Sequence, residues 1–133
     1  MRRSGFCVLA LLAMVAPLLG QDTHAATSPS IPVQRVLLQG LDKVTARVFP
    51  IRAEVGQLIQ FGTLEIIVRQ CFINPPEEPP ESAGFLEIVE VRPGENPQWL
   101  FRGWMFASSP ALSALEHPVY DVWVVECKKA DST

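Results

Sequence analysis

The sequence predicts a small, mainly β domain: an antiparallel sandwich or partly open barrel with one short helical turn and one disulfide. Segments of about four to ten residues, rich in Val, Ile, Phe and Trp, alternate between apolar and polar side chains. Gly, Pro, Asn and Asp separate these segments at short intervals, as turns do between strands. No stretch has sustained helical periodicity, and no repeat of fixed period is visible.

The first residues, 1–25, have the layout of a secretory signal peptide. Arg2 and Arg3 precede an apolar run from Gly5 to Gly20, and Thr23 and Ala25 put small residues at the −3 and −1 positions of a cleavage site. The run is too short to cross a bilayer as a stable helix. We therefore expect cleavage after Ala25, a periplasmic location, and no transmembrane anchor after cleavage.

The rest of the chain has the length of one domain with one hydrophobic core. We predict a flexible leader at 26–34, a single β domain at 35–127 and a tail at 128–133. The full chain has 14 acidic and 11 basic residues, a net charge of −3, and most basic residues stand singly. This charge pattern argues against a nucleic-acid partner.

Two cysteines, Cys71 and Cys127, remain after the predicted cleavage, because Cys7 lies in the apolar run. An even pair in an oxidising compartment predicts a disulfide. A redox or metal-binding pair is the alternative, but there is no C-x-x-C spacing and no histidine near either thiol. We expect no metal site and no cofactor.

Seven segments have strand character, and each ends at a turn signal. They are Arg35–Gln39, Val44–Arg52, Leu58–Phe61, Leu64–Ile73, Gly84–Val91, Gln98–Phe106 and Val119–Cys127. A turn at Gly40–Lys43 separates the first two, and Pro50 indicates that the second strand is bulged or lies at a sheet edge. In the segment Leu64–Ile73, strict alternation places Cys71 on the face opposite Leu64 and Ile66.

The segment Asn74–Ser82 is a proline-acidic loop, which we expect to project as a polyproline-like element. Such a stiff loop would suit docking to a partner protein. The docking residues that we predict are Pro75, Pro76, Glu77, Glu78, Pro79 and Pro80. A calcium site at Glu77, Glu78 and Glu81 is less favoured, because the prolines keep these carboxylates apart.

The later elements follow in the same way. Gly84–Val91 is a strand whose two faces are both mixed, and Arg92–Pro97 is a strong turn signal. After the aromatic strand Gln98–Phe106, Ser108-Ser109-Pro110 predicts an N-cap and one helical turn over Pro110–Leu115. Pro118 ends that turn, and the last strand follows.

Aromatic residues concentrate in the last third of the chain, and most of them should fill the core. A minority beside the predicted helical turn could form a binding patch, since aromatic anchors are enriched at interfaces. The binding residues that we predict are Trp104, Met105, Phe106, Ser108, Ser109, Pro110, Glu116 and His117.

One histidine, His117, remains after the predicted cleavage, and Glu116, Asp121 and several serines are close in sequence. These residues suggest a Ser-His-Asp hydrolase or, with Glu116 and Asp121, a two-carboxylate glycosidase. There is no Gly-x-Ser-x-Gly motif. We favour a structural histidine in a tight loop, so Glu116, His117 and Asp121 are only weak catalytic candidates and no catalytic residue is assigned.

The block GWMFASSPALSALEHPVYDVW at 103–123, together with LDKVTAR at 41–47, FGTL at 61–64 and CFINPPE at 71–77, is distinctive. It resembles an exported domain-of-unknown-function family of alphaproteobacteria, over essentially all of 37–127. The resemblance implies an envelope location and a Cys71–Cys127 pair that belongs to the family pattern. It implies no activity and no catalytic residue.

These observations lead to one expectation and two alternatives. We expect a noncatalytic periplasmic domain that binds or stabilises another envelope protein or a membrane complex, through residues 103–118 and the proline-acidic loop. The first alternative is a small cell-wall or polysaccharide hydrolase. The second is a β domain that binds a small ligand, which would need an internal cavity.

Overall fold

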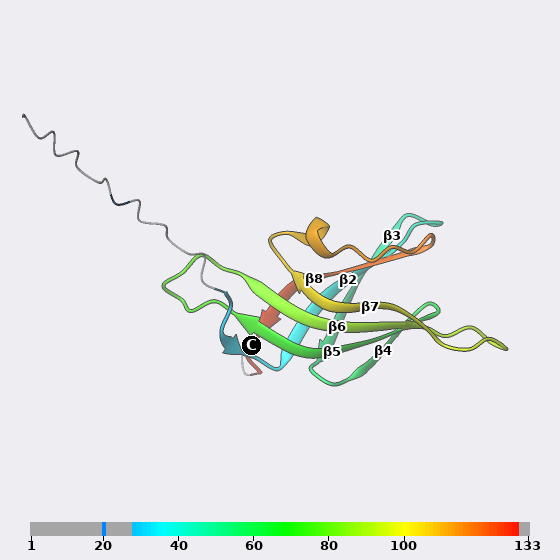
Figure 1. Cartoon of the computed structure of the whole chain (residues 1–133), viewed down its shortest axis with the longest axis horizontal. Coiled ribbons are helices and arrows are strands. Elements are labelled where there is room, and N and C mark those ends of the chain that lie inside the picture. Colours follow the sequence, from blue (N-terminus) through cyan, green and yellow to red (C-terminus); the bar gives the residue numbers. More distant parts are fainter. Residues whose placement is uncertain (1–19, 21–27, 131–133) are drawn as a thin grey trace, which may run out of the picture.

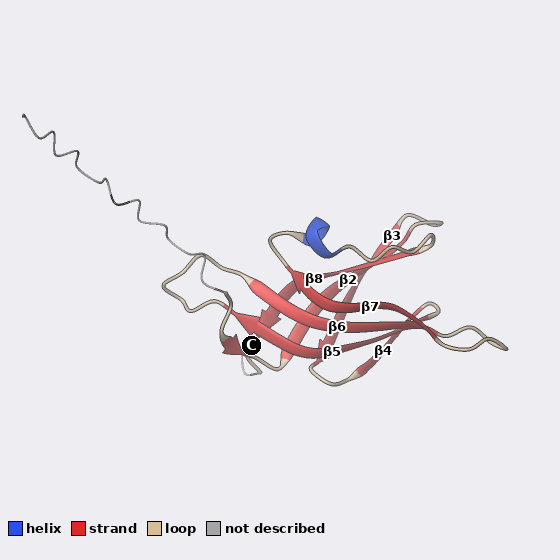
Figure 2. Cartoon of the chain, viewed as in Figure 1, coloured by secondary structure: helices blue, strands red, loops and turns tan. Residues whose placement is uncertain are grey.

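The computed structural model describes Gly20 and residues 28–130, which form a sandwich of two antiparallel sheets (Figures 1 and 2). The predicted signal peptide, except Gly20, lies outside the described residues. The strands are β1 (Ile31–Pro32), β2 (Arg35–Asp42), β3 (Arg47–Glu54), β4 (Leu58–Phe61), β5 (Leu64–Ile73), β6 (Ser82–Glu90), β7 (Gln98–Phe106) and β8 (Tyr120–Lys128). The predicted leader is therefore ordered in part, because β1 pairs with the end of β5.

The larger sheet has five strands and the smaller has three. In the larger sheet β6 lies between β5 and β7, and β1 and β4 pair with different parts of β5. In the smaller sheet β2 lies between β3 and β8. The sheets do not close into a barrel, so of the two predicted architectures the structure is the sandwich. The predicted edge position of Pro50 is confirmed, because β3 is an edge strand.

The core lies between the inner faces of the two sheets and is almost wholly aliphatic. Alternate residues of β2, β5, β6 and β8, together with Met105 of β7, supply it, as expected for sheets with one buried face. Its largest fully buried side chains are Leu38, Leu64, Ile66, Val68, Leu86, Ile88, Met105, Val122 and Val124.

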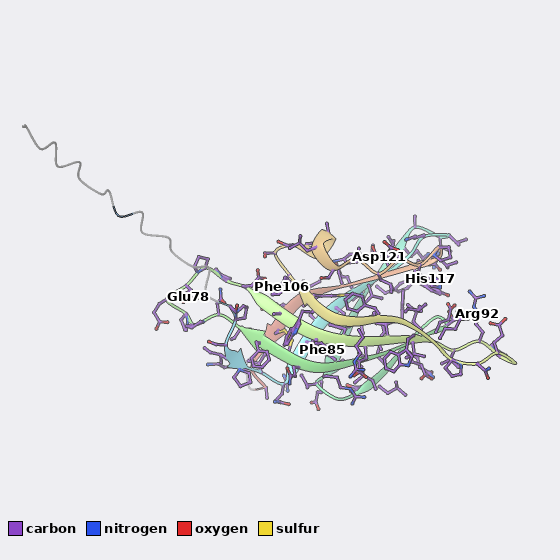
Figure 3. All side chains as sticks on the ribbon, in the orientation of Figure 1. Glu78, Phe85, Arg92, Phe106, His117 and Asp121 are labelled. Atoms are coloured by element: carbon purple, nitrogen blue, oxygen red, sulfur yellow. A yellow bond between two sulfur atoms is a disulfide. The ribbon has the colours of Figure 1, made fainter. Side chains whose placement is uncertain are left out.

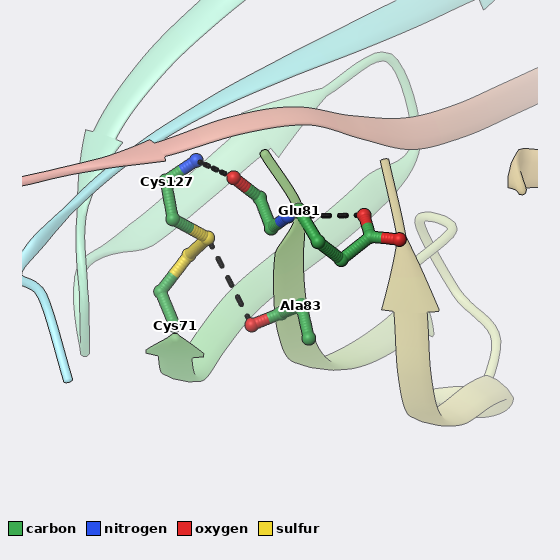
Figure 4. The surroundings of a disulfide bond; sticks show 5 residues. Cys71, Glu81, Ala83 and Cys127 are labelled. Carbon is green, nitrogen blue, oxygen red and sulfur yellow. Dashed lines mark hydrogen bonds between the residues drawn. A yellow bond between two sulfur atoms is a disulfide. The ribbon is translucent and has the colours of Figure 1, made fainter. Parts of the chain in front are cut away.

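The predicted disulfide is confirmed, and it joins the two sheets: Cys71 lies in β5 and Cys127 in β8, with their Cα atoms 5.9 Å apart (Figure 4). Both cysteines face inward, so the predicted outward face of Cys71 is wrong. The reason is a β-bulge in each strand. The strand register skips Arg69 in β5 and Val125 in β8, so neither residue has a backbone partner opposite it. Each extra residue reverses the inward and outward alternation of side chains before the cysteine.

The first predicted turn is also wrong, because β2 continues through Gly40 and Leu41 to Asp42. The chain turns instead at 43–46. The side chain of Asp42 stabilises this turn by accepting hydrogen bonds from the backbone N–H groups of Val44, at 2.9 Å, and Thr45, at 3.2 Å. Ala46 ends it with a φ of 58°.

The segment 107–119, which we call the strap, crosses from β7 in the larger sheet to β8 in the smaller. It contains the 3-10 turn η1 (Pro110–Ser113), which is shorter than the predicted helical turn. Ser109 occupies the predicted N-cap position and Pro110 follows it, but the Ser109 side chain makes no capping hydrogen bond. Leu115 of the strap is buried in the core, whereas Leu112 on η1 is 78% exposed.

Candidate functional site

Two glutamates hold the ends of the strap: Glu81, directly before β6, and Glu90, the last residue of β6. At the first end, Oε1 of Glu81 accepts hydrogen bonds from the N–H groups of Ser82, at 3.0 Å, and Ser108, at 3.1 Å. Oε2 of Glu81 accepts a hydrogen bond from the Ser108 hydroxyl. At the second end, Glu90 contacts His117. The strap is therefore held at both ends by hydrogen bonds to residues at the two ends of β6.

The second anchor is a buried polar pair, because Glu90 and His117 are 7% and 6% exposed. Nδ1 of His117 accepts hydrogen bonds from the N–H groups of Val119, at 3.1 Å, and Tyr120, at 3.0 Å. An accepting Nδ1 carries no proton, so the proton is on Nε2. Nε2 donates to Oε2 of Glu90 at 2.6 Å.

The Glu90 carboxylate has further donors. Thr63 Oγ1 donates to Oε2 at 2.9 Å, and Arg92 Nε lies 3.1 Å from Oε1. Burial raises the pKa of Glu90, but the hydrogen bonds from Thr63 and His117 and the charge of Arg92 outweigh this effect, so the pKa is lower than its ordinary value. Glu90 is therefore an ionised group whose charge is satisfied inside the fold.

A row of aromatic rings connects this pair to the surface. Tyr120 stacks on the His117 ring with centroids 5.4 Å apart. Phe61 contacts Tyr120 at 5.3 Å and Phe49 at 5.8 Å, both edge to face. Gly62 makes room for Tyr120, since a Cβ at this position would lie 2.3 Å from that ring. These rings and the polar pair together close one end of the sandwich.

The structure does not assemble the weak catalytic candidates into a site. The ring nitrogens of His117 bond to Glu90 and to backbone amides. Ser108 lies at the other end of the strap, and Asp121 Oδ1 accepts from the N–H of Val122 at 2.8 Å. Glu116 is exposed. The polar groups around His117 are arranged to hold the strap, which is the structural role that we favoured.

The predicted binding residues divide between the core and the surface. Met105 is in the core and His117 is buried, so a partner protein could not contact their side chains in this fold. Ser108 and Pro110 are exposed, Phe106 and Ser109 are half-buried, and Trp104 is 37% exposed. Figure 3 shows His117 toward the end of the molecule opposite Glu78. Glu116, next to the buried His117, is exposed as well, so the predicted binding residues that remain available lie near both ends of the strap.

Trp104 lies on the outer face of the larger sheet with two aromatic residues that the sequence did not single out. Its ring is 5.3 Å from that of Phe85 and 5.9 Å from that of Phe72. Phe85 is the cross-strand neighbour of Trp104, and Phe72 reaches this face because of the bulge at Arg69. Only the strand register brings the three rings together, so no local sequence signal could have found the cluster.

The proline-acidic loop is folded back on itself rather than extended. Glu78 N–H donates to the carbonyl of Pro75 at 3.0 Å, and the side-chain amide of Asn74 donates to the carbonyl of Pro79 at 2.7 Å. Pro76, Glu77, Pro79 and Pro80 are exposed. The loop begins two residues after Phe72 and includes Glu81, so it connects the aromatic cluster to the first end of the strap.

The disulfide supports the same region. Cys127 N–H donates to the hydroxyl of Ser82 at 2.9 Å, and Ser82 N–H donates to Glu81 (Figure 4). Glu81 in turn accepts hydrogen bonds from Ser108. We call Phe72, Phe85, Trp104, the proline-acidic loop and Ser108 the aromatic corner. Hydrogen bonds and one covalent bond connect it to both sheets. In the part of the chain that the structure describes, no group of three His, Cys, Asp or Glu side chains could hold a metal ion.

Fold and site together define a small β-sandwich domain with an inter-sheet disulfide and a braced aromatic corner. The chain belongs to the family described as "Uncharacterized protein conserved in bacteria (DUF2155)", which it matches over residues 36–127. It is 33% identical over 87 residues to "Uncharacterized protein RP359" of Rickettsia prowazekii (strain Madrid E). The expected resemblance to a bacterial family of unknown function is thus confirmed.

The aligned part covers 65% of this chain and 56% of the Rickettsia protein, so the chain spans little more than half the length of that relative. No solved structure matches the chain. Within residues 28–130 no helix is long and apolar enough to cross a membrane.

Proposed function

We propose that this protein is a noncatalytic periplasmic domain that binds another protein of the envelope, either alone or within a membrane complex, through the aromatic corner. The observation that carries the proposal is the contact of Trp104 with Phe72 and Phe85 on an outer sheet face, directly beside the proline-acidic loop. Aromatic residues at the centre of a patch, surrounded by polar residues, are typical of interface hot spots.

The charges around the cluster indicate the chemistry of the partner. Glu77 is exposed and Glu78 half-buried at the tip of the loop, which projects at one end of the molecule (Figure 3). A complementary surface would insert an apolar or aromatic side chain against Trp104 and place basic residues opposite the loop. Contacts of this kind at the rim of an interface act mainly on association rate and its salt dependence.

The aromatic corner is also preorganised for binding. The loop is closed by its own hydrogen bonds, and Glu81 connects it to the strap. Ordering a loop during association costs free energy, so a loop that is ordered beforehand favours binding. The buried His117 network supports a structural role for that histidine, which favours a binding domain over the hydrolase alternative.

The test compares two tryptophans on one face of one strand. The disulfide-bonded protein is used to capture partners from gently solubilised envelope, with Trp104→Ala and Trp99→Ala as variants. Trp99 is 61% exposed on the outer face of β7 but outside the aromatic corner, so it controls for the loss of an exposed ring. We expect a stoichiometric partner that Trp104→Ala loses and Trp99→Ala keeps.

A second pair of variants tests the charge complementarity. Glu77→Lys should slow association with that partner and weaken its salt dependence, whereas Glu95→Lys, in the distant turn before β7, should not. Thermal unfolding of every variant confirms that the fold is retained. Equal capture by both tryptophan variants, or no stoichiometric partner for the wild type, would contradict the proposal.

A further inference from the structure

A second feature lies on the outer face of the smaller sheet, away from the aromatic corner. A hollow of about 210 Å³ there is lined by Arg35, Val36, Leu37, Arg52, Ala53 and Lys128. An adjoining hollow of about 340 Å³ shares Arg35, Arg52 and Ala53 with it. Three cationic side chains therefore surround one depression on a chain whose net charge is negative.

The strand register accounts for this arrangement. Arg35 on β2 is the direct neighbour of Lys128 on β8, and Arg52 on β3 is the direct neighbour of Leu37, two residues further along β2. Val36, Ala53 and Cys127 face the core, so these three basic residues face outward. Like charges on directly opposed residues destabilise a sheet unless an opposite charge is present.

The carboxylates nearby compensate these charges only in part. Glu126 pairs with Lys128 at 3.3 Å, with both side chains about half exposed. Glu54 is the register partner of Arg35 and lines the adjoining hollow, but it forms no ion pair with Arg35. In the part of the chain that the structure describes, no ion pair or side-chain hydrogen bond is formed by Arg35 or Arg52.

We propose that Arg35 and Arg52, with Lys128 beside them, bind the phosphoryl group of an anionic ligand. Two guanidinium groups offer planar pairs of N–H donors that match phosphate oxygens, and Lys128 adds a third positive charge. Leu37 gives the hollow an apolar wall, which suits a phosphate ester as well as the free anion. This site is independent of the proposed protein-binding function, because it lies on the other sheet.

The phosphoryl group could come from a soluble phosphate or from a phospholipid headgroup, and the experiment separates these sources. In one arm, isothermal titration calorimetry measures the binding of inorganic phosphate and of glycerol phosphate to the disulfide-bonded protein. The other arm measures sedimentation with phosphatidylglycerol vesicles against phosphatidylcholine vesicles. Both arms use the double variant Arg35→Gln/Arg52→Gln.

The matched control is Arg47→Gln. Arg47 is an exposed arginine on the same strand as Arg52, but it pairs with Asp42 in register and does not line the hollow. We expect saturable binding in at least one arm, weakened about tenfold or more by the double variant and unchanged by the control. No saturable binding in either arm, or equal weakening by the control, would overturn the proposal.

Discussion

Glu90 at the end of β6 and His117 at the end of the strap are joined by a 2.6 Å hydrogen bond, and both are buried. The two residues are 27 positions apart, and so are Glu81 and Ser108 at the other end. The strap is therefore hydrogen-bonded at its two ends to carboxylates at the two ends of β6. Between the anchors Leu115 is buried in the core and Leu112 is exposed. The strap is therefore fixed at Ser108, Leu115 and His117, and the exposed turn η1 lies between the first two of these.

Replacement of His117 by Ala should destabilise the fold. It would leave the N–H groups of Val119 and Tyr120 without their acceptor and remove a donor from the buried Glu90 carboxylate. We expect the free energy of unfolding to fall by about 3 kcal/mol. Urea denaturation measures it, and Glu116→Ala, an exposed neighbour, should change it by less than about 0.5 kcal/mol. Similar values for the two variants would argue against the anchor.

Acid should weaken the same anchor. The folded-state pKa of Glu90 lies below its ordinary value of 4.5, so the ionised carboxylate stabilises the fold above about that pH. This contribution is lost as the pH falls through the folded-state pKa. Glu90→Gln lacks it at every pH. The difference in unfolding free energy between wild type and this variant should therefore be largest near neutral pH and shrink in acid. A difference that is constant or grows in acid would contradict this assignment.

Substitutions at two glycines separate the effect of a clash with Tyr120 on stability from the effect of backbone strain. Gly62 and Gly94 have φ values of 59° and 77°, so alanine at either position should cost about 1 kcal/mol through strain. At Gly62 the new Cβ would also lie 2.3 Å from the Tyr120 ring, whereas at Gly94 no atom lies within 4 Å. Gly62→Ala should therefore lower the melting temperature clearly more than Gly94→Ala. Equal shifts would mean that the ring moves aside easily.

The bulge in β8 makes an unusual deletion tolerable. Val124 pairs with Leu38 and Glu126 with Leu37, while Val125 between them has no partner. Removing Val125 would restore regular alternation and leave Cys127 facing inward, so the disulfide should still form. Removing Val125 and Glu126 together would turn Cys127 outward and leave two free thiols. Thiol titration of the unfolded proteins distinguishes these outcomes, and a lost disulfide in the single deletion would contradict the register.

The mainly β class, the positions of most strands and the disulfide could be predicted because each depends on local alternation or on cysteine number, whereas the choice between sandwich and barrel could not. The faces of the two cysteines could not, since an extra residue at Arg69 or Val125 is fixed by the neighbouring strand. Glu90 is in the same alternating set of residues as Leu86 and Ile88, and this position in the sequence indicates a carboxylate on the buried face of the strand.

The partners within the site were beyond the sequence for a different reason. His117 reaches Glu90, and Trp104 reaches Phe72, across long separations in the chain. Such contacts depend on strand order and register, which composition and periodicity do not determine. The proline-acidic loop and the strap were each recognisable as segments, but their connection through Glu81 and Ser108 was not.

The disulfide also determines how the domain would carry mechanical load. If the chain were pulled from its two ends, the tension would pass from Cys71 to Cys127 through the sulfur atoms. The stretch between them would carry no tension, and it contains Trp104, the proline-acidic loop and the strap. Strands β1, β2, β3 and β4, which precede Cys71, would carry the tension. A pulled, oxidised molecule would therefore extend only outside the residues that the disulfide encloses, whereas a reduced one would extend through them as well.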